Sequence, residues 1–435
     1  MFQLISGSGH YPDVVTDLQG NIIWYYYPND LARSDLMSRP LPGGGFLSFQ
    51  SPAAWDLGVN GKQFLRQVDL AGNVVRETNI GVLQQELLAK GAVDGGPCTA
   101  FTGTPPIGAA CTGAFHHDAI QTLPNGWTAA LMSVEKIFPP GTQGDSTGLP
   151  VDIIGDMIVI LDTDWQLQWY WDSFDPAGGG NGYPLLPVSS TAVLGETCGA
   201  RSPGCPPTLL LRSGIAPAAH DWLHANSIYY WPAPQDGNAT GGDIVWSSRH
   251  QDWVFKIDYK DGAGTGNILW RMGPPHTATG LAVNFTFVNQ YNDPWPWFSH
   301  QHDAGIENGG AGPMTLLDNG DTRSAAAPLG LGTACSPYDC NSRGMALSFR
   351  ESSMQVRPKV SFDLGGYSLA MGSAQLLDDG NYFFLNPMLA ADADRTGDVL
   401  DIGPAQPAPQ LGPADVFFGT LGAGALPELA DGQPI

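Results

Sequence analysis

The most constraining feature of the sequence is a weak internal repeat in which two kinds of predicted β-hairpin alternate. The first kind has an apolar strand that ends in Asp, a turn, and a second strand that ends in an aromatic residue. Gly-Asn and related turns between alternating strands are typical of β-hairpins. Copies of this hairpin occupy residues 14–24, 64–75, 157–169, 254–270, 346–362 and 399–418.

The second kind of hairpin lies between these copies and has small residues, a Leu, a turn and then an apolar strand. Its copies occupy residues 41–49, 117–131, 224–246, 302–317 and 374–385. Two alternating hairpins form one four-stranded unit, which is how β-propellers are assembled. We therefore expect an all-β fold, a six-bladed β-propeller with four-stranded antiparallel blades and long rim loops. A large β-sandwich or β-helix with a similar density of turns is the alternative.

The composition favours many short strands. Gly 56 and Pro 36 together make up more than a fifth of the 435 residues, without a collagen-like period. The one convincing helical stretch is residues 82–90. We expect a single domain over residues 1–435, in which residues 1–11 leave the first blade incomplete or close the ring. The Pro/Gly-rich residues 404–413 are expected to form a loop within the last blade.

The charge of the chain restricts its partners. Lys+Arg 19 against Asp+Glu 42 gives a formal net charge of −23. Such a surface repels phosphates, so nucleic acids and anionic membranes are excluded as primary partners, and an anionic substrate would need a local cationic pocket. No apolar run has the length of a transmembrane helix. Residues 1–7 lack the basic and apolar regions of a signal peptide.

The six cysteines fall into three local pairs, each within one Gly/Pro-rich loop and none with zinc-ribbon spacing. Local disulfides are the simplest interpretation, and a metal site or free thiols are the alternatives. Disulfides would place the mature protein in an oxidising compartment, so we expect it to be periplasmic or secreted. The predicted disulfides are Cys98–Cys111, Cys198–Cys205 and Cys335–Cys340.

Most of the nine histidines cluster in four short motifs, at residues 116–118, 220–226, 247–251 and 300–303. His117, His224 and His302 each open a hairpin of the second kind, in three consecutive repeats. The innermost strands of a propeller line its central channel. Side chains at equivalent strand starts are therefore expected to converge near the axis.

Four interpretations of these histidines compete. They are structural residues with satisfied hydrogen bonds, ligands of a metal, parts of a non-catalytic binding propeller, or catalytic nucleophiles with cationic support. His220 and His224 have the i,i+4 spacing of a helical zinc motif, but residues 226–231 are predicted to be a strand.

The order of the motifs is more specific than any one of them. His-His-Asp, Asp-Trp-x-His-x-Asn-Ser-Ile, Ser-Ser-Arg-His-Gln and Gln-His-Asp-Ala follow one another between residues 116 and 386, together with Asp-Asn-Gly-Asp-Thr-Arg at 318–323. This series resembles the bacterial arylsulfate sulfotransferases. The resemblance implies a six-bladed propeller that takes sulfuryl groups from aryl sulfates rather than from a nucleotide donor, through a sulfated histidine, with no cofactor.

The resemblance also implies roles for individual residues. His302 matches the nucleophile, and His224 and Arg249 match supporting residues of the sulfate pocket. The His-His-Asp motif supplies a further histidine, for which His117 is favoured over His116 because it precedes Asp as His302 does. The additional candidates for substrate binding are His116, His300, Trp222, Trp297 and Phe298.

The expected reaction is ping-pong transfer of a sulfuryl group from an aryl sulfate to a phenol, both of them small molecules. Transfer to water would instead make the chain an arylsulfatase-like hydrolase. The chain departs from the family pattern in its short N-terminal region, its longer segment at residues 232–242, its long cysteine-bearing loops and the second imidazole of His300.

Overall fold

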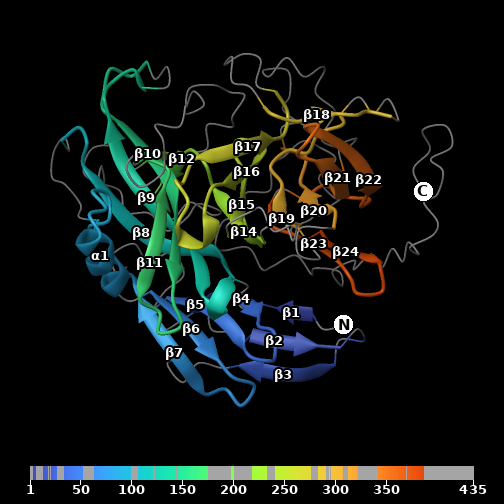
Figure 1. Ribbon diagram of the computed structural model, residues 1–435, viewed down its shortest axis with the longest axis horizontal. Coiled ribbons are helices and arrows are strands. Elements are labelled where there is room, and N and C mark those ends of the chain that lie inside the picture. Colours follow the sequence, from blue (N-terminus) through green and yellow to red (C-terminus); the bar gives the residue numbers. More distant parts are fainter. Residues whose placement is uncertain are drawn as a thin grey trace, which may run out of the picture. The chain divides into compact units, whose positions relative to one another are not determined.

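The computed structural model describes residues 3–5, 13–17, 19, 21–26, 34–51, 63–98, 106–120, 123–142, 146–174, 197–199, 218–232, 241–275, 283–290, 293, 295–306, 312–321, 341–368 and 370–386. The chain divides into two compact units. The first contains Met1–Ser190, Gly195–Ile244 and Ile257–Asn267, and the second contains Thr191–Leu194, Val245–Lys256 and Ile268–Ile435. Helices and strands carry the labels of Figure 1.

Strands dominate both units, and they form several antiparallel sheets, as the repeat predicts. In the first unit, one sheet has the order β4-β5-β6-β7, drawn in blue in Figure 1, with every neighbouring pair antiparallel. Its residues Leu47, Phe49 and Leu65 are almost fully buried. The strands are β4 (Ser34–Pro40), β5 (Phe46–Ser51), β6 (Phe64–Val68) and β7 (Val74–Asn79).

A second sheet of the first unit has the order β12-β13-β10-β9-β8, and β11 also pairs with β10. The central strands β9 and β10 are buried along nearly their whole length, as is typical of apolar strands with packed faces. The strands are β8 (Ala110–Ile120), β9 (Thr128–Phe138), β10 (Val151–Leu161), β11 (Leu167–Asp172), β12 (Thr197–Gly199) and β13 (Ala218–Asp221).

The remaining elements of the first unit are a small sheet and a helix. β1 (Gln3–Ile5), β2 (Asp13–Thr16) and β3 (Ile22–Tyr26) form an antiparallel sheet in that order. Helix α1 (Ile80–Ala89) begins where the Asn79 side chain accepts a hydrogen bond from the Val82 N–H. The helix predicted at residues 82–90 is therefore confirmed, and its apolar face is buried.

A four-stranded sheet has the order β14-β15-β16-β17. Within the second unit, the Trp246 ring of β15 stacks on the Phe255 ring of β16 at 4.8 Å and so joins the two strands. Trp253, also on β16, packs edge-on against Phe255. The strands are β14 (Ala225–Trp231), β15 (Asp243–Ser248), β16 (Trp253–Ile257) and β17 (Ile268–Met272).

The second unit also contains a five-stranded sheet, in the order β18-β22-β21-β20-β19, and the antiparallel pair β23-β24. Leu317, Ala346 and Phe384 lie in one buried cluster of this unit. The strands are β18 (Thr286–Phe287), β19 (His302–Ile306), β20 (Met314–Asp318), β21 (Arg343–Arg350), β22 (Gln355–Asp363), β23 (Ser373–Leu376) and β24 (Tyr382–Leu385).

The predicted hairpins agree with these strands. Hairpins of the first kind appear as β2-β3, β6-β7, β10-β11, β16-β17 and β21-β22, and those of the second kind as β4-β5, β8-β9, β14-β15, β19-β20 and β23-β24. The sixth predicted copy of the first kind, residues 399–418, and the loop predicted at 404–413 lie outside the described residues. The all-β class is therefore confirmed. Among the described residues, no helix has the length and apolar character needed to cross a bilayer.

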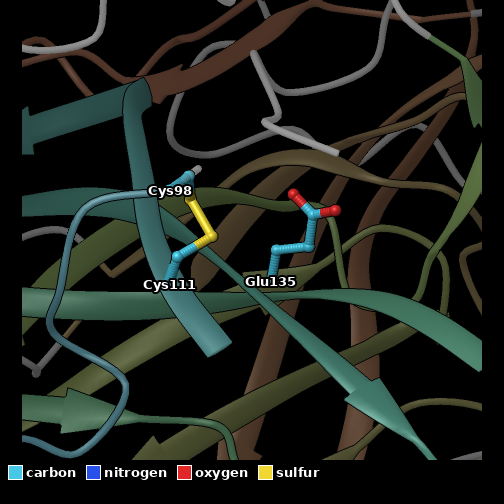
Figure 2. A group of neighbouring side chains, drawn as sticks. All are labelled: Cys98, Cys111 and Glu135. Atoms are coloured by element: carbon cyan, nitrogen blue, oxygen red, sulfur yellow. A yellow bond between two sulfur atoms is a disulfide. The ribbon is translucent and has the colours of Figure 1, made fainter. Parts of the chain in front are cut away.

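One of the three predicted disulfides lies in the described part of the chain and is confirmed. Cys98 and Cys111 are bonded to each other beside the buried Glu135 of β9 (Figure 2). Their sulfur atoms are therefore not available as thiolate ligands for a metal. Cys205, Cys335, Cys340 and the side chain of Cys198 lie outside the described residues.

Candidate active site in two histidine clusters

The predicted nucleophile His302 is the first residue of β19 and is 5% exposed. The preceding residue fixes its position. The side-chain amide of Gln301 donates to Ser247 Oγ at 2.9 Å, to Ser248 O at 3.0 Å and to Trp253 O at 3.1 Å. These bonds tie the start of β19 to β15 and β16, so the backbone that carries His302 is held in one place.

Hydrogen bonds to both ring nitrogens define the tautomer of His302. Nδ1 lies 2.7 Å from Asn319 Oδ1, and the Met371 N–H donates to Nε2 at 3.2 Å. The Asn319 amide cannot be reversed, because its Nδ2 donates to Ser368 O and Met371 O at 3.0 and 3.1 Å. Nδ1 therefore carries the proton and Nε2 carries the lone pair.

The surroundings keep this imidazole neutral. Burial, and after it the positive charge of Arg249, lower the pKa of His302 from 6.5 to about 3, against a smaller opposing effect of the Asn319 hydrogen bond. At neutral pH the side chain is the neutral base that a nitrogen nucleophile must be.

Arg249 is buried and supplies the positive charge beside this histidine. Its Nη2 donates to Asp321 Oδ2 at 3.0 Å, and its Nη1 lies 2.7 Å from His250 Nε2. The Tyr367 hydroxyl donates to the other oxygen of Asp321 at 2.8 Å, which holds that carboxylate in turn. These contacts hold the guanidinium in one orientation. A guanidinium with a fixed orientation suits the binding of an anion.

His300 is fully buried and completes the His302 cluster, which we define as Arg249, His250, Asp252, His300, His302, Asn319 and Asp321. Asp252 Oδ1 accepts the His300 backbone N–H at 2.7 Å and lies 2.9 Å from His300 Nδ1. The two bonds anchor the residue in a left-handed backbone conformation, with φ 50°. His300, which is predicted to bind substrate, is a buried member of the cluster whose ring contacts Asp252.

The first unit contains a second group, the His117 cluster, which we define as His116, His117, Asp118, Asp156, Asp221 and His224. The rings of His117 and His224 meet edge to face at 4.7 Å, and both residues have φ 51°. His224 is held by Asp221, whose Oδ2 lies 2.5 Å from His224 Nδ1. The structure therefore places two of the predicted supporting histidines side by side.

His116 lies behind this pair. Its Nδ1 is 2.9 Å from His117 Nδ1, and its Nε2 is 2.9 Å from Asp156 Oδ1. The other oxygen of Asp156 accepts the backbone N–H of Ala225 at 2.9 Å. His116 is buried and contacts a carboxylate, whereas His117 is the more exposed of the two.

Asp118 stabilises the same region from its other side. Its carboxylate accepts two hydrogen bonds from the Arg39 guanidinium, at 2.6 and 2.8 Å, and one from the Ile228 N–H at 3.0 Å. One buried carboxylate thereby joins β4, β8 and β14.

One expectation about position is corrected and another is confirmed. His117 does not open its strand: it lies inside β8, where the pairing with β9 is irregular between Phe115 and Ala119. Such an irregularity re-aims a side chain without ending the strand. The strand predicted at residues 226–231 is confirmed as part of β14, and His220 lies on β13 rather than on the helix that the zinc motif would need.

The three aromatic candidates differ in exposure. Trp222 is buried and stacks on Phe174 at 5.4 Å, and Phe298 is buried as well. Trp297 is partly exposed and packs edge-on against Phe287 at 4.9 Å. Trp297 is therefore the one of the three whose ring is accessible to a ligand.

Seven residues of the clusters were not among the predicted site residues: Asp118, Asp156, Asp221, His250, Asp252, Asn319 and Asp321. Asn319 and Asp321 belong to the motif at residues 318–323, and that motif was the available signal. Asp156 and Asp252 have no comparable signal, because each meets its histidine only through tertiary packing.

The structure thus combines a buried, neutral histidine with a guanidinium that Asp321 holds in place, and a guanidinium of this kind suits an anionic group. The sequence model of the arylsulfotransferase (ASST) family matches residues 9–401, nearly the whole chain. The chain therefore belongs to the arylsulfotransferase family, and membership implies a sulfotransferase.

The other comparisons add little. No curated protein gives a significant match to the sequence. One similar solved structure, a protein of unknown function from Bacteroides caccae, has 10% sequence identity and a TM-score of 0.36, with 88% of this chain and 82% of that chain covered. A similarity at that level supports no conclusion about this chain.

Proposed function

We propose that this protein transfers a sulfuryl group from an aryl sulfate to a phenol in two steps, through a sulfated His302. The observation that carries the proposal is the state of that side chain, which is buried and neutral, with its proton on Nδ1 and a lone pair on Nε2. Family membership supports the general activity, and the partly exposed Trp297 supports an aromatic substrate.

In the first step, the Nε2 lone pair attacks sulfur and the bond between sulfur and the aryl oxygen breaks, with its electron pair leaving on the phenolate. The imidazole keeps its Nδ1 proton, so the positive ring is held by Asn319. Arg249 offers its guanidinium to the sulfuryl oxygens. The roles of His224 and His117, as donors to the sulfuryl group and to the leaving oxygen, come from the family motifs and are part of the proposal.

In the second step, the acceptor phenol loses its proton to solvent, which returns one to the phenolate released in the first step, and the phenol oxygen attacks sulfur. The N–S bond breaks, and its electron pair returns to Nε2. The free enzyme is regenerated and no net proton is gained or lost. Because the first product leaves before the acceptor reacts, the kinetics are ping-pong. Transfer to the phenol has to be faster than transfer to water.

The proposal includes the fold. The described residues form six sheets, and the hairpins alternate through them as in a blade-by-blade assembly. A six-bladed propeller over residues 1–435 accounts for this arrangement. Proteins of the family are typically periplasmic, and the Cys98–Cys111 disulfide agrees with a periplasmic or secreted protein.

The test is incubation with 4-nitrophenyl sulfate and a second phenol, without any nucleotide. We expect release of nitrophenol and formation of the new aryl sulfate in equal amounts. His302→Asn should abolish both products, whereas His276→Asn, outside the four histidine motifs, should not. Release of nitrophenol with inorganic sulfate as the only other product would instead indicate a hydrolase.

A further inference from the structure

We infer that Asn319 is a positioning residue that makes Nε2 of His302 the attacking atom and keeps it so through both steps. This inference rests on the proposed function of His302. It concerns a residue that the family motifs did not assign and that touches the nucleophile on the side opposite to the attacking atom.

The geometry leaves Asn319 one role toward the ring. Asn319 is fully buried, and its Oδ1 can only accept, so the 2.7 Å contact requires a proton on His302 Nδ1. Both Nδ2 hydrogens are used by the carbonyls of Ser368 and Met371. If the amide oxygen and nitrogen of Asn319 were exchanged, the amide oxygen would face the Ser368 and Met371 carbonyl oxygens, and all three are acceptors. The amide orientation, and with it the tautomer of His302, is therefore fixed.

The same amide also places the group that meets Nε2. It holds the carbonyls of Ser368 and Met371, and the N–H of that same Met371 donates to Nε2 at 3.2 Å. This bond satisfies the lone pair of the buried ring while no substrate is present. An incoming sulfuryl sulfur replaces that contact, and the Met371 N–H can then donate to a sulfuryl oxygen.

An amide differs from a carboxylate at this position. A carboxylate would pair with the imidazolium and raise the pKa of His302, as in Asp-His pairs. Neutral Asn319 stabilises the Nδ1 proton without adding a negative charge. Among the described residues, the charged or titratable groups that act on the ring are Arg249 and His300, and the carboxylate of the next residue, Asp303, accepts the Ala374 N–H at 3.1 Å.

Three variants separate positioning from packing. Asn319→Ala removes the acceptor and both donors. Asn319→Asp keeps an acceptor for Nδ1 and adds a charge. The matched control is Ser342→Ala: Ser342 is also buried, and its hydroxyl bonds to the backbone of Asn319 and Ser368 rather than to the imidazole ring.

The first measurement is the rate of His302 sulfation in a single turnover with 4-nitrophenyl sulfate. We expect Asn319→Ala to slow it on the order of 10- to 100-fold, the effect of one lost hydrogen bond to a reacting group, with little change in the substrate concentration for half-saturation. Asn319→Asp should shift the acidic limb of the rate to higher pH. Ser342→Ala should stay within about threefold of wild type.

The second measurement is ¹⁵N NMR of the histidine side chains. The wild type should show His302 protonated on Nδ1, and Asn319→Ala should show a mixture of the two tautomers. An unchanged tautomer and sulfation rate in folded Asn319→Ala would overturn the inference, as would an equal loss in Ser342→Ala. If the wild type forms no sulfated His302, the proposed function fails first, and the NMR result still decides whether Asn319 sets the tautomer.

Discussion

Replacing His302 by asparagine should remove a pH-dependent part of the folding free energy. The folded state holds His302 neutral with a pKa of about 3, whereas the unfolded chain has an ordinary histidine with a pKa near 6.5. Below the unfolded pKa, the unfolded state binds a proton that the folded state does not. Stability is therefore lost as the pH falls from about 6.5 toward about 3.

The magnitude follows from these two pKa values. Between about pH 8 and about pH 5, protonation of the unfolded histidine lowers the free energy of unfolding by about 2 kcal/mol, while the folded side chain stays neutral. The asparagine that replaces His302 in the variant does not titrate, and its amide can still donate to Asn319. All other titrating groups are common to both proteins, so they cancel in the difference.

The assay is urea unfolding of wild type and His302→Asn at both pH values, followed by tryptophan fluorescence. The acidic chain, with a formal net charge of −23 at pH 7, keeps a net negative charge at the lower pH. The wild type should lose about 2 kcal/mol more stability than the variant. Equal losses in the two proteins would refute the idea that a buried, neutral His302 is the source of the effect.

Three further changes test other parts of the structure. Asp321→Asn weakens the hold on the Arg249 guanidinium at 3.0 Å, and it should reduce kcat/KM for an aryl sulfate about tenfold, measured by nitrophenol release. Replacing Cys98 and Cys111 by Ser opens a disulfide that spans 13 residues; it should lower the stability by about 3 kcal/mol without lowering kcat, as thermal unfolding and turnover will show. Gly372→Ala adds a Cβ 1.9 Å from a leucine side chain at φ +126°, directly after the segment that meets the nucleophile. It should cost about 1–3 kcal/mol in urea unfolding and slow sulfation as well.

Much of the strand order was predictable, because hairpins are local. The turns at residues 17–21 and 69–73 are closed by Asp17 and Asp69, each of which accepts hydrogen bonds from backbone N–H groups within its own turn. Turns of this kind depend on only a few consecutive residues, so they can be predicted from the sequence. The extra strands β12 and β13 beside β10 were not predicted, because β13 pairs with β10 in parallel over a long connection.

The residues of the candidate site likewise divide into those that sequence motifs indicate and those that only the folded structure brings together. His302, His224 and Arg249 could be proposed from the sequence because they stand in short motifs whose order is specific. The partners that determine their chemical state could not, because they lie far away along the chain. Asp252 precedes His300 by 48 residues, and Asn319 follows His302 by 17. A tautomer or a lowered pKa arises from such contacts and from burial, and neither is visible in one sequence.

The central claim, that His302 carries the sulfuryl group, is tested most directly by mass spectrometry after brief exposure to an aryl sulfate without acceptor. We expect one added sulfuryl group per chain, located by peptide mapping on the peptide that contains His302 and removed when a phenol is added. A chain that turns over aryl sulfate while remaining unmodified, or that carries the group on another residue, would contradict the account.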